Sequence, residues 1–500
     1  MKIKSFQEID KPKSNCGVFG IYGHPKASLM AYYGLFSMQH RGQEAAGITT
    51  FYFDEKKNKN RFAYNKGTGL LSEVFADPKV FENVLIGNSA IAHNRYSTTG
   101  STTRANIQPF NMIYKSGLIS LAHNGNLTNT TKLRNDLQAQ GAIFQTTTDS
   151  ELFLHLIAHS KQDTQLKQIH EALNIAKGAY SIVVLTDDSL VGARDPFGVR
   201  PLSIGKLDYD GGTSYVLASE TCAFDIIGAE YVRSVNHNEI VVIDNETLNT
   251  GEIKSYKIWE EDPPQSKHCI FEYIYFARPD SKIFGENVDK IRRKLGKVLA
   301  EEHPVIKDDD EKVNVIPVPD SGNTSTLGFA TQNNKLNYPT KFEFGLIRSH
   351  YVGRSFISPE QDARELKVKM KFNLVKGIIE GRHVTIVDDS IVRGTTSKIL
   401  VKLIREANPK SLDMRITSPP VKFPCHYGMD FPSKEELIAN HHQTEDEIGK
   451  DIGVDSLKYL SIKKLMSIVP NGGKIGYCNA CFTGEYPIEI EENLNKLSAE

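Results

Sequence analysis

The sequence predicts a two-domain protein of mixed α/β and α+β class, and three observations lead to this prediction. The chain has 500 residues, more than a single domain usually contains, so two or three domains are expected. A joint rich in proline and charge, residues 260–266 (EEDPPQS), interrupts it near the middle. Before this joint strands and helices mix irregularly, whereas after it apolar strands end in polar turns that lead into helices.

The first half contains short segments of both kinds. Residues 16–22, 117–122, 179–185, 214–217 and 239–243 are strand-like, and residues 131–140 and 150–159 are helical. Because no regular strand–helix–strand rhythm appears, we expect two packed sheets with helices on their outer faces.

Polar residues follow a predicted strand of the second half. Residues 384–387 (VTIV) lead into Asp388 and Asp389, and a Gly-Thr-Thr-Ser turn then opens a helix at residues 398–405. The N–H groups and dipole of a helix start favour a phosphate, while paired carboxylates suit sugar hydroxyls or a metal ion. These features predict a site for a phosphorylated ribose with Mg²⁺ nearby. The structural alternative is that Asp-Asp-Ser caps the helix and Gly-Thr-Thr is an ordinary turn.

Composition argues against several classes of function. The formal net charge of −1 gives no indication of a nucleic-acid partner. No apolar run approaches the roughly 18 residues of a membrane helix, and the Lys-rich N-terminus lacks the apolar core of a secretion signal. Six cysteines are too few for a disulfide framework, so we expect a reducing compartment, the cytoplasm.

Cys16 marks an abrupt change in the sequence. Residues 1–15 are polar and charged, and a buried strand is predicted to begin at the cysteine. If residues 1–15 are a leader that is removed, the Cys16 thiol lies beside a free α-amine, whose pKa of about 7.7–8.0 suits a general base. The thiol would then be an N-terminal nucleophile. Taken alone, Cys16 also fits a buried core cysteine.

Several motifs of the first half resemble class II glutamine amidotransferases. They start at Cys16 and include residues 39–48 (QHRGQEAAGI), 92–100 (AHNRYSTTG), 122–127 (AHNGNL), 147–151 (TTDSE), 194–202 (RDPFGVRPL) and 217–220 (LASE). The resemblance implies an αββα sandwich of the N-terminal nucleophile hydrolase type, with Cys16 as the nucleophile. Asn124 and the N–H of Gly125 would form an oxyanion hole. Arg95 would bind the α-carboxylate of glutamine, and Asp149 its α-ammonium group.

Some of these residues also have structural interpretations. Asn-Gly is a common hairpin turn, and Arg95 could be a surface charge. His40, His93 and His123 each lie beside a motif, and we interpret them as hydrogen-bonded structural histidines.

The second half resembles type I phosphoribosyltransferases, which bind 5-phosphoribosyl-1-pyrophosphate (PRPP). The resemblance lies in residues 383–397 (HVTIVDDSIVRGTTS) and in the turn at 320–324 (DSGNT), after a second predicted strand. It implies a parallel-sheet fold in which Ser321, Asp388 and Asp389 bind Mg²⁺, an ion that prefers oxygen ligands. The implied PRPP site consists of Asp388, Asp389, Ser390, Arg393, Gly394, Thr395, Thr396, Ser397 and Lys371.

A basic segment, residues 348–371, separates the two PRPP loops. We favour a mobile lid that closes over pyrophosphate, although an ordinary solvated charge run is the alternative. Its candidate side chains are Arg354, Arg364, Lys367, Lys369 and Lys371.

Four cysteines of the second half form a candidate metal site: Cys269, Cys425, Cys478 and Cys481. Four thiolates can hold zinc or an iron–sulfur cluster, and spacing alone favours zinc. The surrounding motifs, CIFE, PCHYG and CNACFTGEYP, resemble family members that carry a [4Fe–4S] cluster and lose a leader. Cys222 has no evident chemical role, so we expect it in the core.

With residues 269–280 (CIFEYIYFARPD), the chain resembles the amidophosphoribosyltransferase family almost end to end. The resemblance implies a glutaminase domain at residues 16–255 and a phosphoribosyltransferase domain with a cluster-binding segment at residues 256–500. The first would release ammonia from glutamine. The second would combine it with PRPP to give 5-phosphoribosylamine and pyrophosphate, the first committed step of purine synthesis. Homo-oligomers, dimers or tetramers, inhibited by purine nucleotides are also implied.

Three other functional hypotheses fit parts of these patterns. Another class II amidotransferase would lack the PRPP loops. A PRPP-sensing regulator that binds DNA would share the second half, but neither the net charge nor a helix-turn-helix pattern favours it. A glutaminase half without activity is disfavoured by the intact Cys16, Arg95, Asn124 and Asp149.

Overall fold

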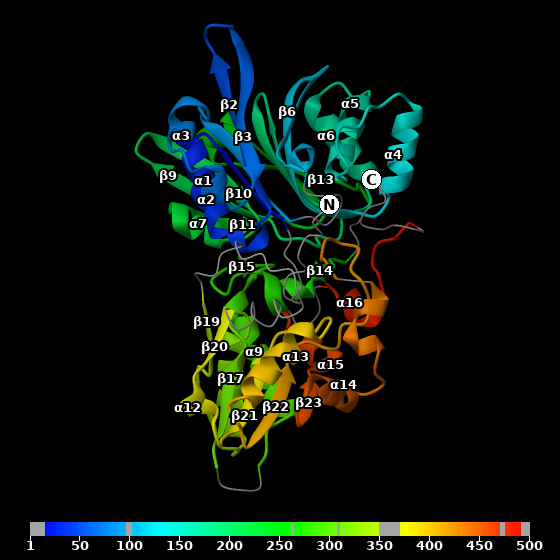
Figure 1. The fold of residues 1–500 in the computed structure, drawn as a ribbon. Helices are drawn as coiled ribbons and strands as arrows, with labels where there is room; N and C mark the ends of the chain where they lie inside the picture. The colour runs from blue at the N-terminus through cyan, green and yellow to red at the C-terminus, as the bar shows by residue number, and fades with distance from the viewer. Residues whose placement is uncertain are drawn as a thin grey trace, which may run out of the picture.

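The computed structural model describes residues 16–96, 103–261, 265–307, 311–349, 371–431, 433–470 and 476–491 (Figure 1). The predicted leader lies outside the described residues, as do four of the predicted lid residues, Arg354, Arg364, Lys367 and Lys369. Within these ranges, no helix is long and apolar enough to span a membrane.

The N-terminal domain contains two antiparallel sheets, with strand orders β11-β9-β10-β1-β4-β2-β3 and β13-β12-β8-β7-β6-β5. The first sheet consists of β1 (Gly17–Tyr22), β2 (Ala45–Asp54), β3 (Lys59–Thr68), β4 (Ser89–Arg95), β9 (Ser203–Tyr209), β10 (Gly212–Ala218) and β11 (Glu230–Ser234). The second consists of β5 (Phe110–Tyr114), β6 (Gly117–Leu127), β7 (Gly178–Thr186), β8 (Ser189–Arg194), β12 (Glu239–Asp244) and β13 (Lys254–Lys257). The helices are α1 (Ala27–Ser37), α2 (Leu71–Val74), α3 (Lys79–Asn83), α4 (Thr130–Ala139), α5 (Ser150–His159), α6 (Gln165–Ile175), α7 (Cys222–Ile227) and α8 (Asn245–Thr250).

Strand β1 illustrates why the central strands are apolar on both faces. Successive side chains of a strand point to opposite sides. Val18 packs in the core between the two sheets with Val183, whereas Phe19 and Ile21 pack against α1 and α7 on the outer face. Gly20 allows the sheets to approach, because a Cβ there would lie 2.7 Å from Val183 Cγ1. Since α5 and α6 cover the second sheet, the layers are helix, sheet, sheet and helix, which confirms the predicted αββα sandwich.

The C-terminal domain is built on a parallel sheet of strand order β18-β17-β21-β22-β23, which confirms the predicted fold class. Its strands are β17 (Val313–Pro317), β18 (Thr340–Phe342), β21 (His383–Asp388), β22 (Ser411–Ile416) and β23 (Ser456–Tyr459). The helices are α9 (Val288–Glu302), α10 (Asn323–Lys335), α12 (Lys376–Ile379), α13 (Thr395–Arg405), α14 (Glu445–Ile452), α15 (Ile462–Ile468) and α16 (Ala480–Thr483). Three short strand pairs are β14 (His268–Cys269) with β24 (Tyr477–Cys478), β15 (Lys282–Ile283) with β16 (Glu286–Asn287), and β19 (Leu346–Arg348) with β20 (Phe372–Leu374).

One predicted element of the N-terminal domain is much longer than expected. Helix α5 has the predicted bounds, but the strand predicted to end at residue 122 continues to Leu127 as β6. Its backbone pairs with β7, where Asn124 lies opposite Ser181 and Gly125 opposite Tyr180. The polar side chains of this segment do not show the pattern of a strand in the sequence. The strand forms because its backbone is hydrogen-bonded to β7. Asn124 and Gly125 are therefore not a hairpin turn.

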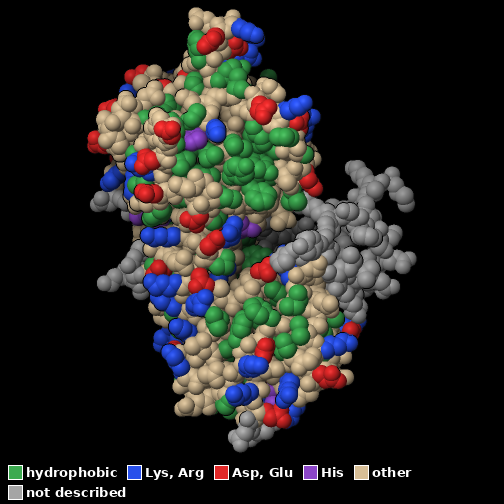
Figure 2. Space-filling model, turned by 90° about the vertical axis from the view of Figure 1, so that its left-hand side faces the viewer, with side chains coloured by type: hydrophobic (Ala, Val, Ile, Leu, Met, Phe, Trp, Pro, Cys, Tyr) green, Lys and Arg blue, Asp and Glu red, His purple; other side chains and the backbone are tan. Residues whose placement is uncertain are grey.

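The two domains share a core. Ala179 and Val199 of the N-terminal domain belong to the same apolar cluster as Tyr273 and Tyr427 of the C-terminal domain. The last described segment returns to the first domain, where Thr128 Oγ1 donates to a backbone carbonyl 2.7 Å away. Figure 2 shows the two lobes from one side, with hydrophobic side chains gathered on the upper lobe and Lys and Arg side chains along the lower one.

Candidate active sites

Cys16 lies directly before β1 and is buried. Its Sγ donates to the Tyr96 carbonyl at 3.4 Å, and the following N–H, of Gly17, donates to Asn94 Oδ1 at 2.8 Å. Burial raises the pKa of the thiol, and the charge of Arg95 opposes this shift. The thiol is therefore protonated at neutral pH and needs a neighbouring base to become a nucleophile.

The side chain of Asn124 is buried in β6 without a hydrogen bond. Neither its Nδ2 nor its Oδ1 has a partner among the described residues. Buried amides are normally hydrogen-bonded, so this amide is available to bind a ligand. The next residue must be glycine, because Gly125 has a φ of +152° and a Cβ there would lie 2.0 Å from Ala179 O. Such a pair can receive an oxyanion.

Arg95 and Asp149 are also buried. Arg95 ends β4 with 3% of its surface exposed, so it is not a surface charge. Asp149 precedes α5 and accepts a hydrogen bond from the N–H of Leu127 at 2.9 Å, which holds it beside the end of β6. Both charges act on the pKa of the Cys16 thiol. The fold therefore brings the predicted glutamine-site residues together in one buried region.

The three histidines beside these motifs have hydrogen-bond partners. His40 Nε2 lies 2.8 Å from Glu220 Oε1, His93 Nε2 lies 3.1 Å from the carbonyl of His123, and His123 Nδ1 lies 2.9 Å from Ser150 Oγ. Burial lowers the pKa of His93 to about 3, so its ring is neutral. These contacts agree with a structural role for all three.

The two carboxylates of the second site lie where β21 ends, and both are buried. Ser321 reaches them from the loop that follows β17, and its Oγ donates to Asp389 Oδ2 at 2.5 Å. Ser390 Oγ donates to the other oxygen at 2.7 Å, and Asp389 N–H donates to Asp388 Oδ1 at 2.9 Å. Because β17 and β21 are neighbours in the sheet, the two predicted PRPP loops meet at one edge.

The start of α13 is the predicted phosphate position. Gly394 precedes the helix with a φ of +78°, and a Cβ there would lie 2.4 Å from Ile438 Cδ1. Thr395 is exposed, whereas Thr396 and Ser397 are buried in the first turn. Because α13 follows the carboxyl end of β21, its first turn begins at that edge of the sheet, and a helix start favours an anion.

Basic residues of this edge are paired with the protein. Arg393 Nη2 lies 3.1 Å from Glu436 Oε2, and Arg348 Nη1 lies 2.7 Å from Asp320 Oδ2. Lys371 Nζ lies 6.0 Å from the centre of the Phe372 ring. These contacts do not test the PRPP contacts expected of Arg393 and Lys371, which stay predictions.

The four cysteines line one small cavity, together with aromatic and aliphatic side chains. Strands β14 and β24 pair in parallel and place Cys269 opposite Cys478. Burial raises the pKa of Cys269 to about 11, and burial with the neighbouring thiols raises those of Cys478 and Cys481. In the part of the chain that is described, no group of three or more His, Cys, Asp or Glu side chains is found that could hold a metal ion. Cys222, as expected, is a core residue against α1.

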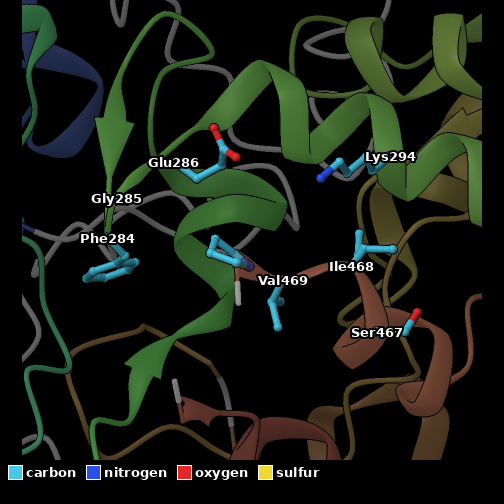
Figure 3. Close-up of a pocket in the computed structure, with 8 residues that line it drawn as sticks. Phe284, Gly285, Glu286, Lys294, Ser467, Ile468 and Val469 are labelled. Carbon is cyan, nitrogen blue, oxygen red and sulfur yellow. The ribbon is translucent and has the colours of Figure 1, made fainter. Parts of the chain in front are cut away.

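A larger hollow of about 530 Å³ contains none of the predicted site residues (Figure 3). It is lined by Phe284, Gly285, Glu286, Lys294, Ser467, Ile468, Val469 and Pro470.

Sequence reasoning missed a set of buried charged residues at the domain boundary. Arg41, Arg200, Glu220 and Glu272 are all fully buried. Glu272 stands within an apolar run, residues 270–276 (IFEYIYF). A lone carboxylate in such a run is a signal that could have been used, because a buried charge must find a partner.

Comparisons with known proteins agree with both halves of this description. Residues 93–225 match the model of a glutamine amidotransferase domain. The chain is 47% identical to a chloroplastic amidophosphoribosyltransferase of Vigna aconitifolia, covering 99% of this chain and 96% of that protein. It is 46% identical to the amidophosphoribosyltransferase of Archaeoglobus fulgidus, covering 95% and 98%.

Solved structures give the same result over the whole chain. One described as the allosteric regulatory enzyme of purine biosynthesis is 43% identical, with a TM-score of 0.85 and coverage of 96% of this chain and 97% of that one. The glutamine PRPP amidotransferase of Bacillus subtilis, complexed with ADP and GMP, is 42% identical with a TM-score of 0.85, covering 97% and 100%. The chain belongs to the amidophosphoribosyltransferase family.

Proposed function

We propose that residues 16–255 hydrolyse glutamine and that residues 256–500 combine the ammonia with PRPP, after a leader of residues 1–15 has been removed. The products are glutamate, 5-phosphoribosylamine and pyrophosphate, in the first committed step of purine synthesis. The observation that carries the glutaminase half is the buried amide of Asn124, which has no hydrogen-bond partner in the described ranges. Strand β13 (Lys254–Lys257) belongs to the second sheet of the N-terminal domain, so we place the end of this domain at Lys257, just beyond residue 255.

In the first half-reaction, the Cys16 thiol gives its proton to its own α-amine and attacks the amide carbon of glutamine. Asn124 Nδ2 and the N–H of Gly125 stabilise the resulting oxyanion. Collapse of this intermediate releases ammonia, and water then hydrolyses the thioester to glutamate. Arg95 and Asp149 hold the two charged groups of the amino acid and so fix its orientation.

In the second half-reaction, ammonia attacks C1 of the ribose and pyrophosphate leaves. The first turn of α13, including Thr396 and Ser397, binds the 5-phosphate, and Asp388 and Asp389 face the sugar. Mg²⁺ would neutralise charge on the pyrophosphate, and Ser321, Asp388 and Asp389 are an all-oxygen set that fits it. Free ammonia is mostly protonated in water, so we propose that it passes between the sites inside the protein.

The four cysteines are proposed to hold a [4Fe–4S] cluster. All four residues line one cavity together with aromatic and aliphatic side chains, and a bound metal group would offset the cost of burying their thiolates. Four thiolates can also hold a single zinc ion, with each sulfur about 2.3 Å from the metal, and metal analysis distinguishes the two. When bound, the cluster would tie the segment around Cys478 and Cys481 to the rest of the domain.

The proposal also includes inhibition by nucleotides, an oligomeric state and a cellular location. The Bacillus subtilis relative was solved with ADP and GMP, so we propose that purine nucleotides inhibit this enzyme. We also propose a homo-oligomer, a dimer or tetramer, in the cytoplasm. All six cysteines are free, which is expected in a reducing compartment.

One anaerobic experiment tests the proposed function. Purified protein is assayed for pyrophosphate release that depends on both PRPP and glutamine, and its intact mass is measured. We expect release with either glutamine or ammonium as nitrogen donor, from a chain that begins at Cys16. A fully active chain that still begins at Met1 would contradict the α-amine mechanism. Iron and sulfide are measured on the same sample: about four of each support the cluster, and one zinc without iron refutes it.

A further inference from the structure

A fully buried arginine joins the Cys16 residue to the C-terminal domain. Arg41 ends the short helix η1 (Gln39–Arg41), and its Nε donates to the Cys16 carbonyl at 3.2 Å. Its terminal nitrogens donate to the two oxygens of Glu272 at 3.0 and 2.7 Å. Glu272 begins η3 (Glu272–Phe276), a π-helix of the C-terminal domain. One guanidinium therefore binds the backbone of the proposed nucleophile and a carboxylate of the other domain.

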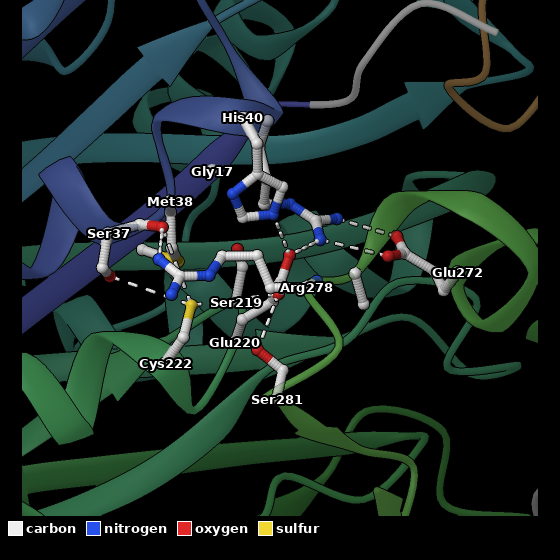
Figure 4. Close-up of polar contacts among 12 residues, drawn as sticks. Gly17, Ser37, Met38, His40, Ser219, Glu220, Cys222, Glu272, Arg278 and Ser281 are labelled. Atoms are coloured by element: carbon white, nitrogen blue, oxygen red, sulfur yellow. Dashed lines mark hydrogen bonds and ion pairs between the residues drawn. The ribbon is translucent and has the colours of Figure 1, made fainter. Parts of the chain in front are cut away.

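Glu220 completes the pairing of Arg41 from the N-terminal side (Figure 4). His40 also contacts this carboxylate, and the C-terminal domain reaches it through the N–H of Arg278 and Oγ of Ser281, each at 2.8 Å. Burial raises the pKa of Glu220, but the neighbouring His40 and Arg41 lower this pKa by more, so it lies well below the ordinary value. The carboxylate is therefore ionised, and it anchors Arg41 to both domains.

Glu272 has a second arginine partner. Arg200 Nη1 lies 3.3 Å from Glu272 Oε1, and Arg200 Nε donates to the carbonyl of Tyr427 at 3.0 Å. The N–H of Tyr427 in turn contacts Cys425 Sγ at 3.4 Å. The network thus extends from the Cys16 carbonyl to the segment that carries one of the four cavity cysteines. The positive charges of Arg41 and Arg200 and the negative charges of Glu220 and Glu272 neutralise one another in a region without solvent exposure.

The hydrogen bond from Arg41 to Cys16 is important because of the position of Cys16 in the chain. As the first residue of the proposed mature chain, Cys16 has a peptide neighbour on its carbonyl side only. The contact of Arg41 with its carbonyl and the bond from Gly17 to Asn94 therefore fix the residue that carries both the thiol and the amine. Buried charges are costly to maintain, and apolar side chains could hold two domains together as well.

We propose that Glu272 is a positioning residue for glutamine hydrolysis. Through Arg41, the C-terminal domain sets the position of the Cys16 carbonyl, and thereby of the reacting thiol and amine. The inference rests on the proposed role of Cys16 and goes beyond it by giving a residue of the other domain a part in the same reaction.

The test is Glu272→Gln, measured by separate assays of glutamine hydrolysis and of ammonium-driven synthesis. We expect kcat for hydrolysis to fall by about 10- to 100-fold, as small misplacements of reacting groups can do. The KM for glutamine should change little, since Arg95 and Asp149 are untouched, and ammonium-driven synthesis should stay within about twofold. A matched control is Glu239→Gln, which neutralises a buried carboxylate of the N-terminal domain that is paired with Arg233 and has no contact with Arg41 or Cys16 among those described. It should leave hydrolysis unchanged.

A second variant separates positioning from charge imbalance. Arg41→Gln combined with Glu272→Gln keeps the buried charges balanced, with Arg200 and Glu220 left. If hydrolysis returns to the wild-type rate in this variant, or if Glu272→Gln lowers both activities equally, the proposal is wrong. A hydrolysis defect that is no larger in the double variant than in Arg41→Gln alone supports it. Cys16→Ala serves as reference: hydrolysis that survives it would overturn the role of Cys16 itself, whereas hydrolysis lost there but kept in Glu272→Gln would overturn only this inference.

Discussion

The proposed glutamine site and the proposed PRPP site are built in opposite ways. Around Cys16, buried polar side chains project from the strands of two packed sheets, and Asn124 lacks a partner in the described chain. At the edge of the parallel sheet, the candidate ligands lie in loops after the strands and already bond to each other, as Ser321 does to Asp389. The first site thus already presents a hydrogen-bonding amide to glutamine. The second site must break hydrogen bonds between its own side chains when PRPP binds.

This difference teaches where each chemistry obtains its precision. An oxyanion needs donors that are fixed before the reaction, and strands paired along their length provide them. A large charged ligand such as PRPP needs phosphate and metal contacts from several loops, which open α/β sheets provide at the carboxyl ends of their strands. Substitutions at the two sites should therefore affect different reactions.

Removing both carboxylates of the second site should have the largest effect. Asp388→Asn with Asp389→Asn should lower synthesis from glutamine and from ammonium by roughly 10³-fold or more, because two charged groups that face the sugar and Mg²⁺ are lost. Glutamine hydrolysis should persist. Asp413→Asn, on the neighbouring strand β22 and paired with Lys307, is the control that should retain both routes. Equal loss of hydrolysis in the double variant would contradict two separate sites.

Truncating the unpartnered amide should affect only the first site. Asn124→Ala should lower kcat for glutamine hydrolysis by about 10²- to 10³-fold, the usual cost of one oxyanion donor. Ammonium-driven synthesis should be unchanged. Asn111→Ala, in β5 of the same domain, removes an amide that accepts hydrogen bonds from Thr49 and Ser120 and should leave kcat almost unaltered. A change below threefold in Asn124→Ala would argue against the oxyanion hole.

The cysteine cavity should contribute to stability and not to either reaction directly. Cys481→Ser should lower the free energy of unfolding by several kcal/mol, since binding of the metal group is part of the folding energy. Chemical denaturation of anaerobic samples measures this loss. Oxygen should bleach and inactivate the wild type, because oxidised clusters fall apart. An air-stable, colourless protein of equal stability would contradict the assignment.

The smallest effect is expected at the cysteine without a chemical role. Cys222→Ala leaves a small cavity against α1 and should cost about 1 kcal/mol of stability. Both activities should keep wild-type rates, measured with saturating substrates. A large loss of activity at unchanged stability would show that this thiol has a function we have not assigned.

Sequence patterns predicted this fold unevenly, for physical reasons. The helical pattern of residues 150–159 predicted the bounds of α5, and the apolar run before Asp388 predicted β21. The end of β6 was missed because His123, Asn124 and Asn126 are polar there and only the pairing with β7 keeps the chain extended. Periodicity detects buried apolar faces, and it does not detect strands whose side chains serve a site.

The candidate sites were predictable where a motif carries its own chemistry. The site at Asp388, Asp389 and the helix start of α13 was predicted from the types and order of residues, whereas the roles of Asn124 and Gly125 were predicted from the resemblance to class II glutamine amidotransferases. The pairing of Arg41 with Glu272 could not, because 231 positions separate two charged residues that meet only when the domains pack. The predicted lid residues outside the described ranges stay predictions.

We propose that one chain carries two chemically separate sites, and the variant Cys16→Ala tests this separation. Formation of 5-phosphoribosylamine is measured with PRPP and either glutamine or a high concentration of ammonium. We predict that glutamine-driven synthesis falls by about 10⁴-fold or more, as for loss of other catalytic nucleophiles, while ammonium-driven synthesis stays near the wild-type rate. If the folded variant also lost the ammonium-driven reaction, or kept the glutamine-driven one, the account would be contradicted.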